Sequence, residues 1–286
     1  MPELAYLNGK IMPIAEAMVP AEDRGYNFGD AVYEYVASYN GKLFCLEPHL
    51  DRLERSMGEL AFVPLPRDMV RDAILDLFAK ALIPRAGIYL QISRGVAPRD
   101  HAYPPAGTPL QFFMTIRPVR EKPPELREKG ASAITVTDLR WGRCDIKTVQ
   151  LLPNCMAKQQ ALEAGVFDAI FVSAEGVVRE GTSSNLFIAK NGHLITHPLT
   201  PQILPGITRQ VVMDICRDEG ITVEERYYDR SELASADEAF LTGTVTEVLA
   251  LARIDGRPVG SGAVGPLGKR IYRCLLDRIK DLSSAP

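Results

Sequence analysis

Hydrophobic and polar positions in the first 120 residues follow two different periods. Strand-like runs around Asn8-Gly9 and Asn40-Gly41, the second of them rich in Val and Tyr, predict two β-hairpins, because both residues of an Asn-Gly turn readily adopt positive φ. Other stretches space their hydrophobic side chains three and four positions apart, which is typical of amphipathic helices. The predicted helices lie at residues 47–60 and 67–82, and buried strands are predicted at 31–39, 87–94 and 110–116. This mixture predicts an α+β domain over residues 1–117.

A segment rich in proline and charge, residues 118–124, follows this domain and is typical of a linker. Beyond it, strand and helix patterns alternate again. Predicted strands lie at 133–137, 169–172, 177–178, 185–189 and within 240–252, and predicted helices at 154–164, 207–218 and 267–282. A chain of 286 residues suits two domains of modest size, so we expect residues 125–286 to form the second.

The overall composition argues against several classes of protein. The chain has 33 basic and 36 acidic residues and a formal net charge of −3, so no nucleic-acid partner is expected. Its five cysteines are odd in number and lack a Cys-x-x-Cys pair, and its four histidines lack metal-ligand spacing, so we expect neither a disulfide framework nor a metal site. No apolar run approaches the roughly 18 residues of a membrane span, and the N-terminus does not resemble a signal peptide. We therefore expect a cytoplasmic protein without a membrane partner.

One glycine-rich stretch resembles a nucleotide-binding motif. Residues 260–265, GSGAVG, match the dinucleotide fingerprint letter by letter, which would suggest a nicotinamide oxidoreductase. That motif needs a strand–turn–helix within a βαβ unit, whereas Pro258 stands just before this stretch and a single predicted helix remains after it. We interpret it as a flexible turn.

Four short segments carry side chains suited to catalysis or anion binding. A lone lysine such as Lys147 is usually a surface charge. A catalytic lysine must instead be desolvated or placed near cations so that its pKa falls, and spacing in the sequence alone does not show this. Glu180 opens a stretch typical of a hairpin loop, although a buried carboxylate there could keep a pyridine nitrogen protonated. Residues 204–209 open a predicted helix, whose free N–H groups could bind phosphate, and 242–244 form a second turn with hydroxyls.

Taken together, these segments resemble the fold-type IV pyridoxal-phosphate enzymes, the class that holds the branched-chain and D-amino acid aminotransferases. The matches run in the family's order through EDRGYNFGD (22–30), VYE (32–34), HLDRL (49–53), DIK (145–147), EGTSSN (180–185), LPGITR (204–209) and TGT (242–244). The resemblance implies a homodimer of two-domain α+β subunits. Each would have a smaller N-terminal α/β sandwich-like domain and a larger C-terminal β-barrel-like domain with helices.

The resemblance also implies roles for individual residues toward pyridoxal 5'-phosphate. Lys147 would bind the cofactor through a Schiff base and then shuttle the α-proton of the substrate. Glu180 would pair with the pyridine nitrogen. The remaining cofactor-binding positions would hold the phosphate or lie beside it: Arg52, Ser183, the backbone N–H groups of Ile207 and Thr208, and the hydroxyl of Thr244.

The stretch from Ser93 to His101 resembles the loop with which D-amino acid aminotransferases bind the substrate carboxylate. Arg99 and His101 match the two loop residues of that grip, and Tyr33 matches a tyrosine on an early strand that helps them. This favours ping-pong transamination of a D-amino acid such as D-alanine with a 2-oxo acid such as 2-oxoglutarate. Residues 243–245 are nearer the branched-chain pattern, so an L-branched-chain aminotransferase is an alternative. An aminodeoxychorismate lyase and a catalytically silent cofactor-binding scaffold are two others.

Overall fold

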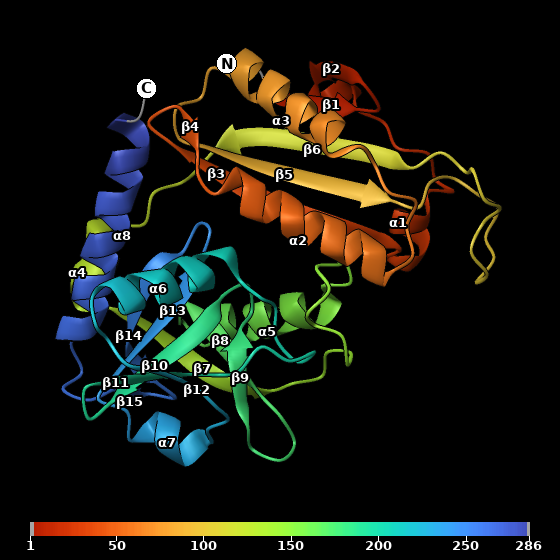
Figure 1. Ribbon diagram of the computed structural model, residues 1–286. Helices are drawn as coiled ribbons and strands as arrows, with labels where there is room; N and C mark the ends of the chain where they lie inside the picture. The colour runs from red at the N-terminus through yellow and green to blue at the C-terminus, as the bar shows by residue number, and fades with distance from the viewer. Residues whose placement is uncertain (1–2, 285–286) are drawn as a thin grey trace. The chain divides into compact units, whose positions relative to one another are not determined.

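The computed structural model describes residues 3–284, and these form two compact units. Unit 1 consists of residues 3–120 together with the short segment 146–150, and unit 2 of residues 121–145 and 151–284 (Figure 1). The first break falls inside the proline-rich stretch at 118–124. The return of 146–150 to unit 1 departs from the predicted division at a single linker, and it carries Lys147 into unit 1.

Unit 1 is a six-stranded antiparallel sheet, in the order β2-β1-β6-β5-β3-β4. Its strands are β1 (Leu4–Leu7), β2 (Lys10–Pro13), β3 (Ala31–Tyr39), β4 (Lys42–Leu43), β5 (Ala86–Ser93) and β6 (Gln111–Pro118), and its helices are the 3-10 helix η1 (Ile14–Glu16), α1 (Arg24–Phe28), α2 (Leu46–Glu59) and α3 (Arg67–Ala81). Both predicted hairpins are present. Asn8 and Gly9 have φ of 47° and 93°, and Asn40 and Gly41 have 49° and 78°, as a two-residue turn of this kind needs.

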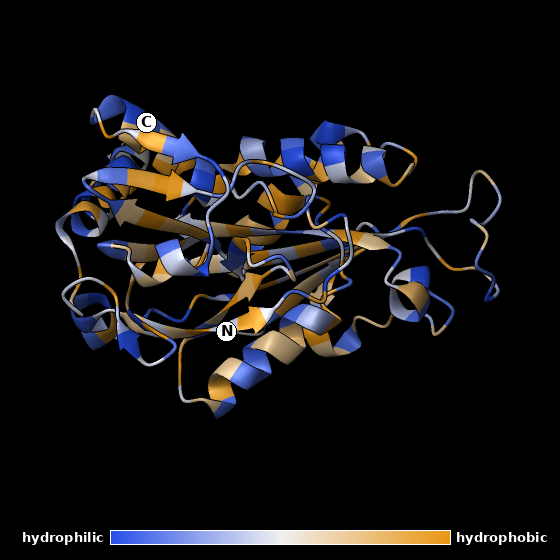
Figure 2. Ribbon diagram, turned by 90° about the horizontal axis from the view of Figure 1, so that it is seen from below, coloured by the Kyte–Doolittle hydropathy of each residue, from blue (hydrophilic) through white to orange (hydrophobic). Residues whose placement is uncertain are grey.

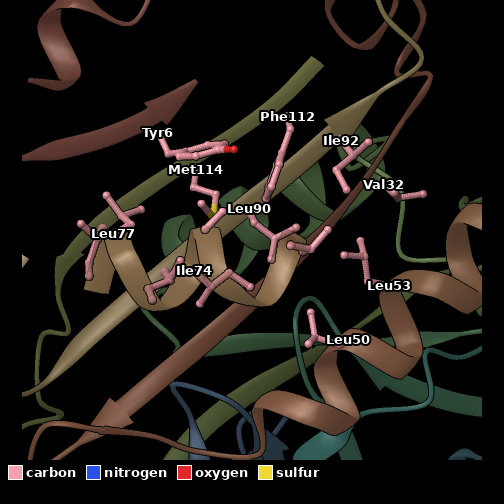
Figure 3. Close-up of a cluster of buried hydrophobic side chains, with 14 of the residues drawn as sticks. Tyr6, Val32, Leu50, Leu53, Ile74, Leu77, Leu90, Ile92, Phe112 and Met114 are labelled. Atoms are coloured by element: carbon pink, nitrogen blue, oxygen red, sulfur yellow. The ribbon is translucent and has the colours of Figure 1, made fainter. Parts of the chain in front are cut away.

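The core of unit 1 lies between one face of this sheet and two helices. Side chains that alternate along β3, β5 and β6 meet the apolar faces of α2 and α3 in one buried cluster. Figure 3 shows Leu50 and Leu53 of α2 and Ile74 and Leu77 of α3 directed toward the strand residues of this cluster. The helices therefore form one layer on one side of the sheet.

Unit 2 is built on a nine-stranded sheet in the order β12-β11-β10-β13-β14-β7-β8-β9, with β15 beside β14. Its strands are β7 (Ala131–Thr137), β8 (Asp168–Val172), β9 (Val178–Gly181), β10 (Asn185–Lys190), β11 (His193–Thr196), β12 (Val223–Glu225), β13 (Glu238–Gly243), β14 (Glu247–Ile254) and β15 (Arg257–Pro258), and its helices are α4 (Pro124–Lys129), α5 (Leu152–Glu163), α6 (Ile207–Asp218), α7 (Arg230–Ala234) and α8 (Pro266–Ser284). Because β9 pairs with both β8 and β10, part of the sheet closes on itself. This confirms the predicted α+β class and its barrel-like second domain.

Apolar side chains from the strands of the closed part fill its interior. Helix α6 begins at Ile207 and ends at Asp218, as its hydrophobic spacing predicts. The helices carry both blue and orange residues in Figure 2, and in α2, α6 and α8 the hydrophobic residues gather on one side. The glycines at 260–265 lie between the two-residue strand β15 and α8, outside any βαβ unit, so they form the expected turn.

Candidate active site

Lys147 is fixed in unit 1 by its backbone on two sides. Its carbonyl oxygen accepts a hydrogen bond of 2.9 Å from the Tyr33 N–H, and its own N–H donates to the Ser56 Oγ at 3.3 Å. Residues 147–149 thus pair antiparallel with the first residues of β3, on its edge away from β5, through a bridge between Val32 and Thr148. The Lys147 Nζ lies 4.1 Å from the centre of the Tyr33 ring. The structure therefore brings two of the predicted site residues, Lys147 and Tyr33, into contact.

Arg52 is held by a buried acid that the sequence pattern did not single out. The Arg52 Nε and Nη2 donate to the two carboxylate oxygens of Glu34, at 2.7 and 2.8 Å. The same carboxylate lies 2.7 Å from the His49 Nδ1. Burial opposes ionisation of Glu34, but the charges and hydrogen bonds of Arg52 and His49 outweigh it and lower its pKa. Glu34 therefore orients Arg52 on the face of β3 that packs against α2.

Arg99 and His101 meet at one aromatic ring. The Arg99 guanidinium lies 5.1 Å from the centre of the Phe28 ring, and the His101 ring packs edge-on against Phe28 with a centroid distance of 5.8 Å. Both side chains are exposed on the loop after β5. Within residues 3–284, no hydrogen bond, ion pair or ring contact joins either of them to Tyr33. A single chain thus brings together two of the three predicted carboxylate-binding residues.

Glu180 lies at the end of β9, beside a tight hairpin turn, and is buried at 5% exposure. Its carboxylate accepts hydrogen bonds from the Arg140 Nη1 at 2.5 Å, the Asn185 Nδ2 at 3.0 Å and the Leu204 N–H at 3.1 Å. Burial raises the pKa of this carboxyl group, and Arg140 counteracts part of that rise. A cationic N–H placed against Glu180 would stabilise its ionised form further.

Arg140 is a component of the site that sequence reasoning missed. It donates to both carboxylate oxygens of Asp138, at 3.0 and 2.8 Å, and its guanidinium lies 4.1 Å from the centre of the Phe171 ring. These contacts aim its Nη1 at Glu180. A lone arginine in a loop gives no sequence signal, because its partner Glu180 is forty positions away.

The start of α6 is not capped by a side chain. Gly206 is the N-cap residue and no side chain caps the helix, so the first N–H groups, those of Ile207 and Thr208, lack the usual side-chain acceptor. Asn185 connects this helix start to Glu180, because its Nδ2 donates both to Glu180 and to the Leu204 carbonyl at 2.8 Å. The predicted phosphate site and pyridine-nitrogen partner are therefore neighbours in unit 2.

The two hydroxyl-rich turns, at Ser183 and at Thr244, lie close together and differ in exposure. A Cβ on Gly243 would stand 3.3 Å from the Ser183 carbonyl oxygen, so the turns of Ser183 and Thr244 approach closely. Ser183 is exposed and Thr244 half-buried. The flanking hydroxyls of Thr182 and Ser184 instead donate to the buried Asp168, at 2.5 and 3.3 Å. These two hydrogen bonds fix the turn to the buried Asp168 of β8.

Gly206→Ala is expected to weaken binding of a phosphorylated cofactor by about tenfold or more. The φ of Gly206 is −68°, which alanine also adopts, but its Cβ would stand 2.0 Å from the Asn185 Oδ1. Asn185 can move away only by giving up its bonds to Glu180 and Leu204. Titration of the apoprotein with pyridoxal phosphate measures the effect. Gly142→Ala, where the added Cβ meets open space, is the matched control.

The chain matches the family model described as amino-transferase class IV over residues 31–254. It is 43% identical over 273 residues to the D-alanine aminotransferase of Bacillus licheniformis, covering 95% of each chain. The chain belongs to the class IV aminotransferases. It is also 39% identical over 281 residues to the D-alanine aminotransferase of Staphylococcus haemolyticus, covering 98% of this chain and 99% of that one.

Solved structures similar to this class IV aminotransferase include branched-chain amino acid aminotransferases. That of Escherichia coli has a TM-score of 0.85 and 27% identity, covering 96% of this chain and 94% of that one. That of Thermoproteus uzoniensis, solved with norvaline, has a TM-score of 0.87 and 28% identity, covering 98% and 96%. Another, solved with pyridoxamine 5'-phosphate, has a TM-score of 0.89 and 27% identity, covering 98% and 94%. The fold-type IV architecture is therefore confirmed.

Residues 3–284 of this aminotransferase include neither a membrane-spanning helix nor a cluster of metal-ligating side chains. No helix in that range is long and apolar enough to cross a membrane. In the same range, no group of three or more His, Cys, Asp or Glu side chains is placed to hold a metal ion.

Cys144 is expected to resist alkylation although it lies three positions from Lys147. Burial raises the pKa of its thiol to about 11, and its Sγ donates to the Trp141 carbonyl. The reactive thiolate therefore forms only as the pH approaches that value, whereas Cys155 is exposed. At about pH 8, mass spectrometry after iodoacetamide treatment should show Cys155 modified well before Cys144. The opposite order would mean that the charge of Arg140, which lowers the pKa of Cys144, outweighs the effect of burial.

Proposed function

We propose that this aminotransferase transfers the amino group of a D-amino acid such as D-alanine to a 2-oxo acid such as 2-oxoglutarate, by a ping-pong mechanism. Two observations support the proposal. Relatives named D-alanine aminotransferase match nearly the full chain at 43% and 39% identity. In addition, Arg99 and His101 lie together at Phe28, where two cationic or hydrogen-bonding groups suit a carboxylate.

The cofactor of this enzyme is pyridoxal 5'-phosphate, and the residues present fit it. The uncapped start of α6 with Gly206 suits a phosphate, and the buried Glu180 suits a protonated ring nitrogen. Ile207 and Thr208 would hold the phosphate through their backbone N–H groups, with Arg52, Thr244 and Ser183 as further contacts. When bound, the cofactor supplies an electron sink for the pair of electrons that remains when the α-proton leaves.

The side chains of the enzyme then bind, orient and move protons. Lys147 would hold the cofactor covalently through its Nζ, and after substrate binding the same Nζ would carry the α-proton from one atom to the next. The contacts of its backbone with Tyr33 and Ser56 fix where that nitrogen can reach. Glu180, aimed by Arg140 and Asn185, would keep the ring nitrogen protonated.

The choice of enantiomer follows from where the substrate carboxylate binds. Lys147 takes the α-proton from one side only, so the position of the carboxylate decides which enantiomer presents its α-proton to the Nζ. Arg99 and His101 would place the carboxylate for a D-amino acid. L-branched-chain transamination is the second candidate, favoured by Gly243-Thr244-Val245 and by the folds of solved relatives.

Kinetics with paired donors test this proposal. With 2-oxoglutarate as acceptor, D-alanine should form pyruvate at a kcat/KM at least about a hundredfold above that of L-alanine or L-isoleucine. Pyruvate release is followed by lactate dehydrogenase coupling, and L-isoleucine turnover by L-glutamate formation. A preference for L-isoleucine would replace the proposed substrate by the branched-chain alternative.

We further propose a cytoplasmic homodimer, in which the loop of Arg99 and His101 serves the Lys147 of the partner. Within residues 3–284 neither Arg99 nor His101 contacts Tyr33, and both are exposed, which supports the idea. Mixing a Lys147→Ala protein with an Arg99→Ala/His101→Ala protein should then restore activity, because each heterodimer regains one intact site. If the dimers exchange subunits but activity does not return, the loop acts within its own chain.

A further inference from the structure

The motif EDRGYNFGD at residues 22–30 has no role in the site as described so far. It forms α1 and its two ends, at the edge of unit 1 beside the end of β5 and the loop that projects from it (Figure 1). We propose that Arg24 and Phe28 of this motif are positioning residues, which hold Arg99 and His101 in the geometry that binds the substrate carboxylate. This inference rests on the proposed function, since it names what aligns the same carboxylate-binding site.

Arg24 fixes the backbone between the two loop residues. It is 3% exposed, and its Nη1 donates to the main-chain carbonyl of Asp100 at 2.7 Å. Its Nε donates to the Asp30 Oδ2 at 2.8 Å, so the guanidinium cannot turn away. Because Asp100 stands between Arg99 and His101, a restraint on its carbonyl restrains the directions of both neighbouring side chains.

Phe28 is the surface on which the two side chains rest. The guanidinium carbons of Arg24 and Arg99 lie 4.7 and 5.1 Å from the centre of its ring. The negative face of an aromatic ring attracts such cations, and the His101 ring packs edge-on against the same ring, at an interplanar angle of 66°. The pair of loop side chains therefore shares one support although both are exposed.

Arg94 anchors the base of the same loop. It donates to the carbonyls of Leu60 and Ala61 at 2.7 and 3.2 Å, and its guanidinium lies 3.7 Å from the centre of the Tyr103 ring, beyond His101. Arg94 and Arg24 both donate to Asp30, which partly balances their charges. The loop is thus restrained at its start, at its middle and near Tyr103.

Asp100 accepts the hydrogen bond of Arg24 through its main-chain carbonyl, and its side chain bonds to the loop itself. The Asp100 Oδ1 accepts a hydrogen bond of 3.0 Å from the Ala102 N–H. This contact gives the carboxylate a local structural partner.

A loop restrained in advance loses less conformational freedom when substrate binds, so loosening it should weaken binding of the carboxylate specifically. Arg24→Lys keeps the charge but cannot make both contacts of a planar fork. Phe28→Leu removes the ring and leaves the hydrogen bonds of Arg24 in place. Each should raise the KM for D-alanine by about tenfold, with kcat and the affinity for pyridoxal phosphate within about twofold of the parent enzyme. Tyr26→Ala, at an exposed position on the same helix, is the control.

Hydrogen–deuterium exchange of residues 96–103 gives a readout that does not depend on activity. Both variants should exchange faster there while α2 and β5 stay unchanged. An unchanged KM and unchanged exchange in both variants, together with a raised KM for Arg99→Ala, would overturn the positioning role alone. An Arg99→Ala variant with normal KM for D-alanine would overturn the carboxylate role of the loop, and this inference with it.

Discussion

Replacing Lys147 with alanine should abolish transamination, with a loss on the order of 10⁴-fold or more, because one side chain supplies both the covalent attachment and the proton transfer. The protein itself should stay folded. The contacts that fix segment 146–150 run through the backbone to Tyr33, Ala31 and Ser56, and alanine retains all of them. Turnover of D-alanine and the visible absorption of the purified protein measure the effect.

Lys10→Ala is a suitable control, since Lys10 is an exposed lysine on β2 of the same unit. It should keep full activity and the visible band. Addition of a small primary amine should restore part of the proton transfer to the Lys147→Ala protein without restoring the covalent attachment. Appreciable turnover by Lys147→Ala alone would assign the chemistry to another residue and return the silent-scaffold alternative to consideration.

Glu180→Gln should lower kcat for D-alanine by about a hundredfold or more while the fold persists. The amide keeps the shape of the side chain but cannot keep a ring nitrogen protonated, so the cofactor becomes a poorer electron sink. The change also leaves the buried Arg140 with Asp138 as its remaining acidic partner, which should lower stability by about 1–3 kcal/mol.

Two further variants separate these two effects. Arg140→Met removes the ion pair and leaves Glu180 in place, so it should lower stability and affect kcat less than Glu180→Gln does. Glu175→Gln, in the exposed turn before β9, should change neither quantity. A Glu180→Gln enzyme with normal kcat and reduced stability would show that Glu180 is a structural partner of Arg140 rather than a partner of the cofactor.

Much of the fold could be predicted where a local signal determines the local structure. The two Asn-Gly hairpins and the bounds of β3 and α6 follow directly from turn chemistry and from spacing. A third Asn-Gly turn, Asn191-Gly192, joins β10 and β11 with positive φ at both residues and carries the same sequence signal. The return of 146–150 to unit 1 could not be predicted, because it depends on pairing with β3 more than one hundred positions away.

In the candidate site, too, some residues carry a signal in the sequence and others do not. Ordered motifs predicted Lys147 and Glu180, and the structure adds what surrounds them. Glu34 carried a signal of a buried ion pair, because it is an acid on the same face of β3 as Val32 and Val36. Both of these valines are wholly buried. Arg140 had no such signal. Long-range ion pairs form between loops whose relative positions only the folded chain defines, so spacing in the sequence does not reveal them.

The most direct test of the account is the visible spectrum of the purified protein, loaded with pyridoxal phosphate, before and after an amino donor is added without any 2-oxo acid. D-Alanine should bleach the visible band, because the amino group moves to the cofactor and pyruvate leaves, while L-isoleucine should leave it intact. Bleaching by L-isoleucine alone would contradict the carboxylate role of Arg99 and His101. A protein that acquires no visible band with pyridoxal phosphate would contradict the cofactor assignment on which the whole account rests.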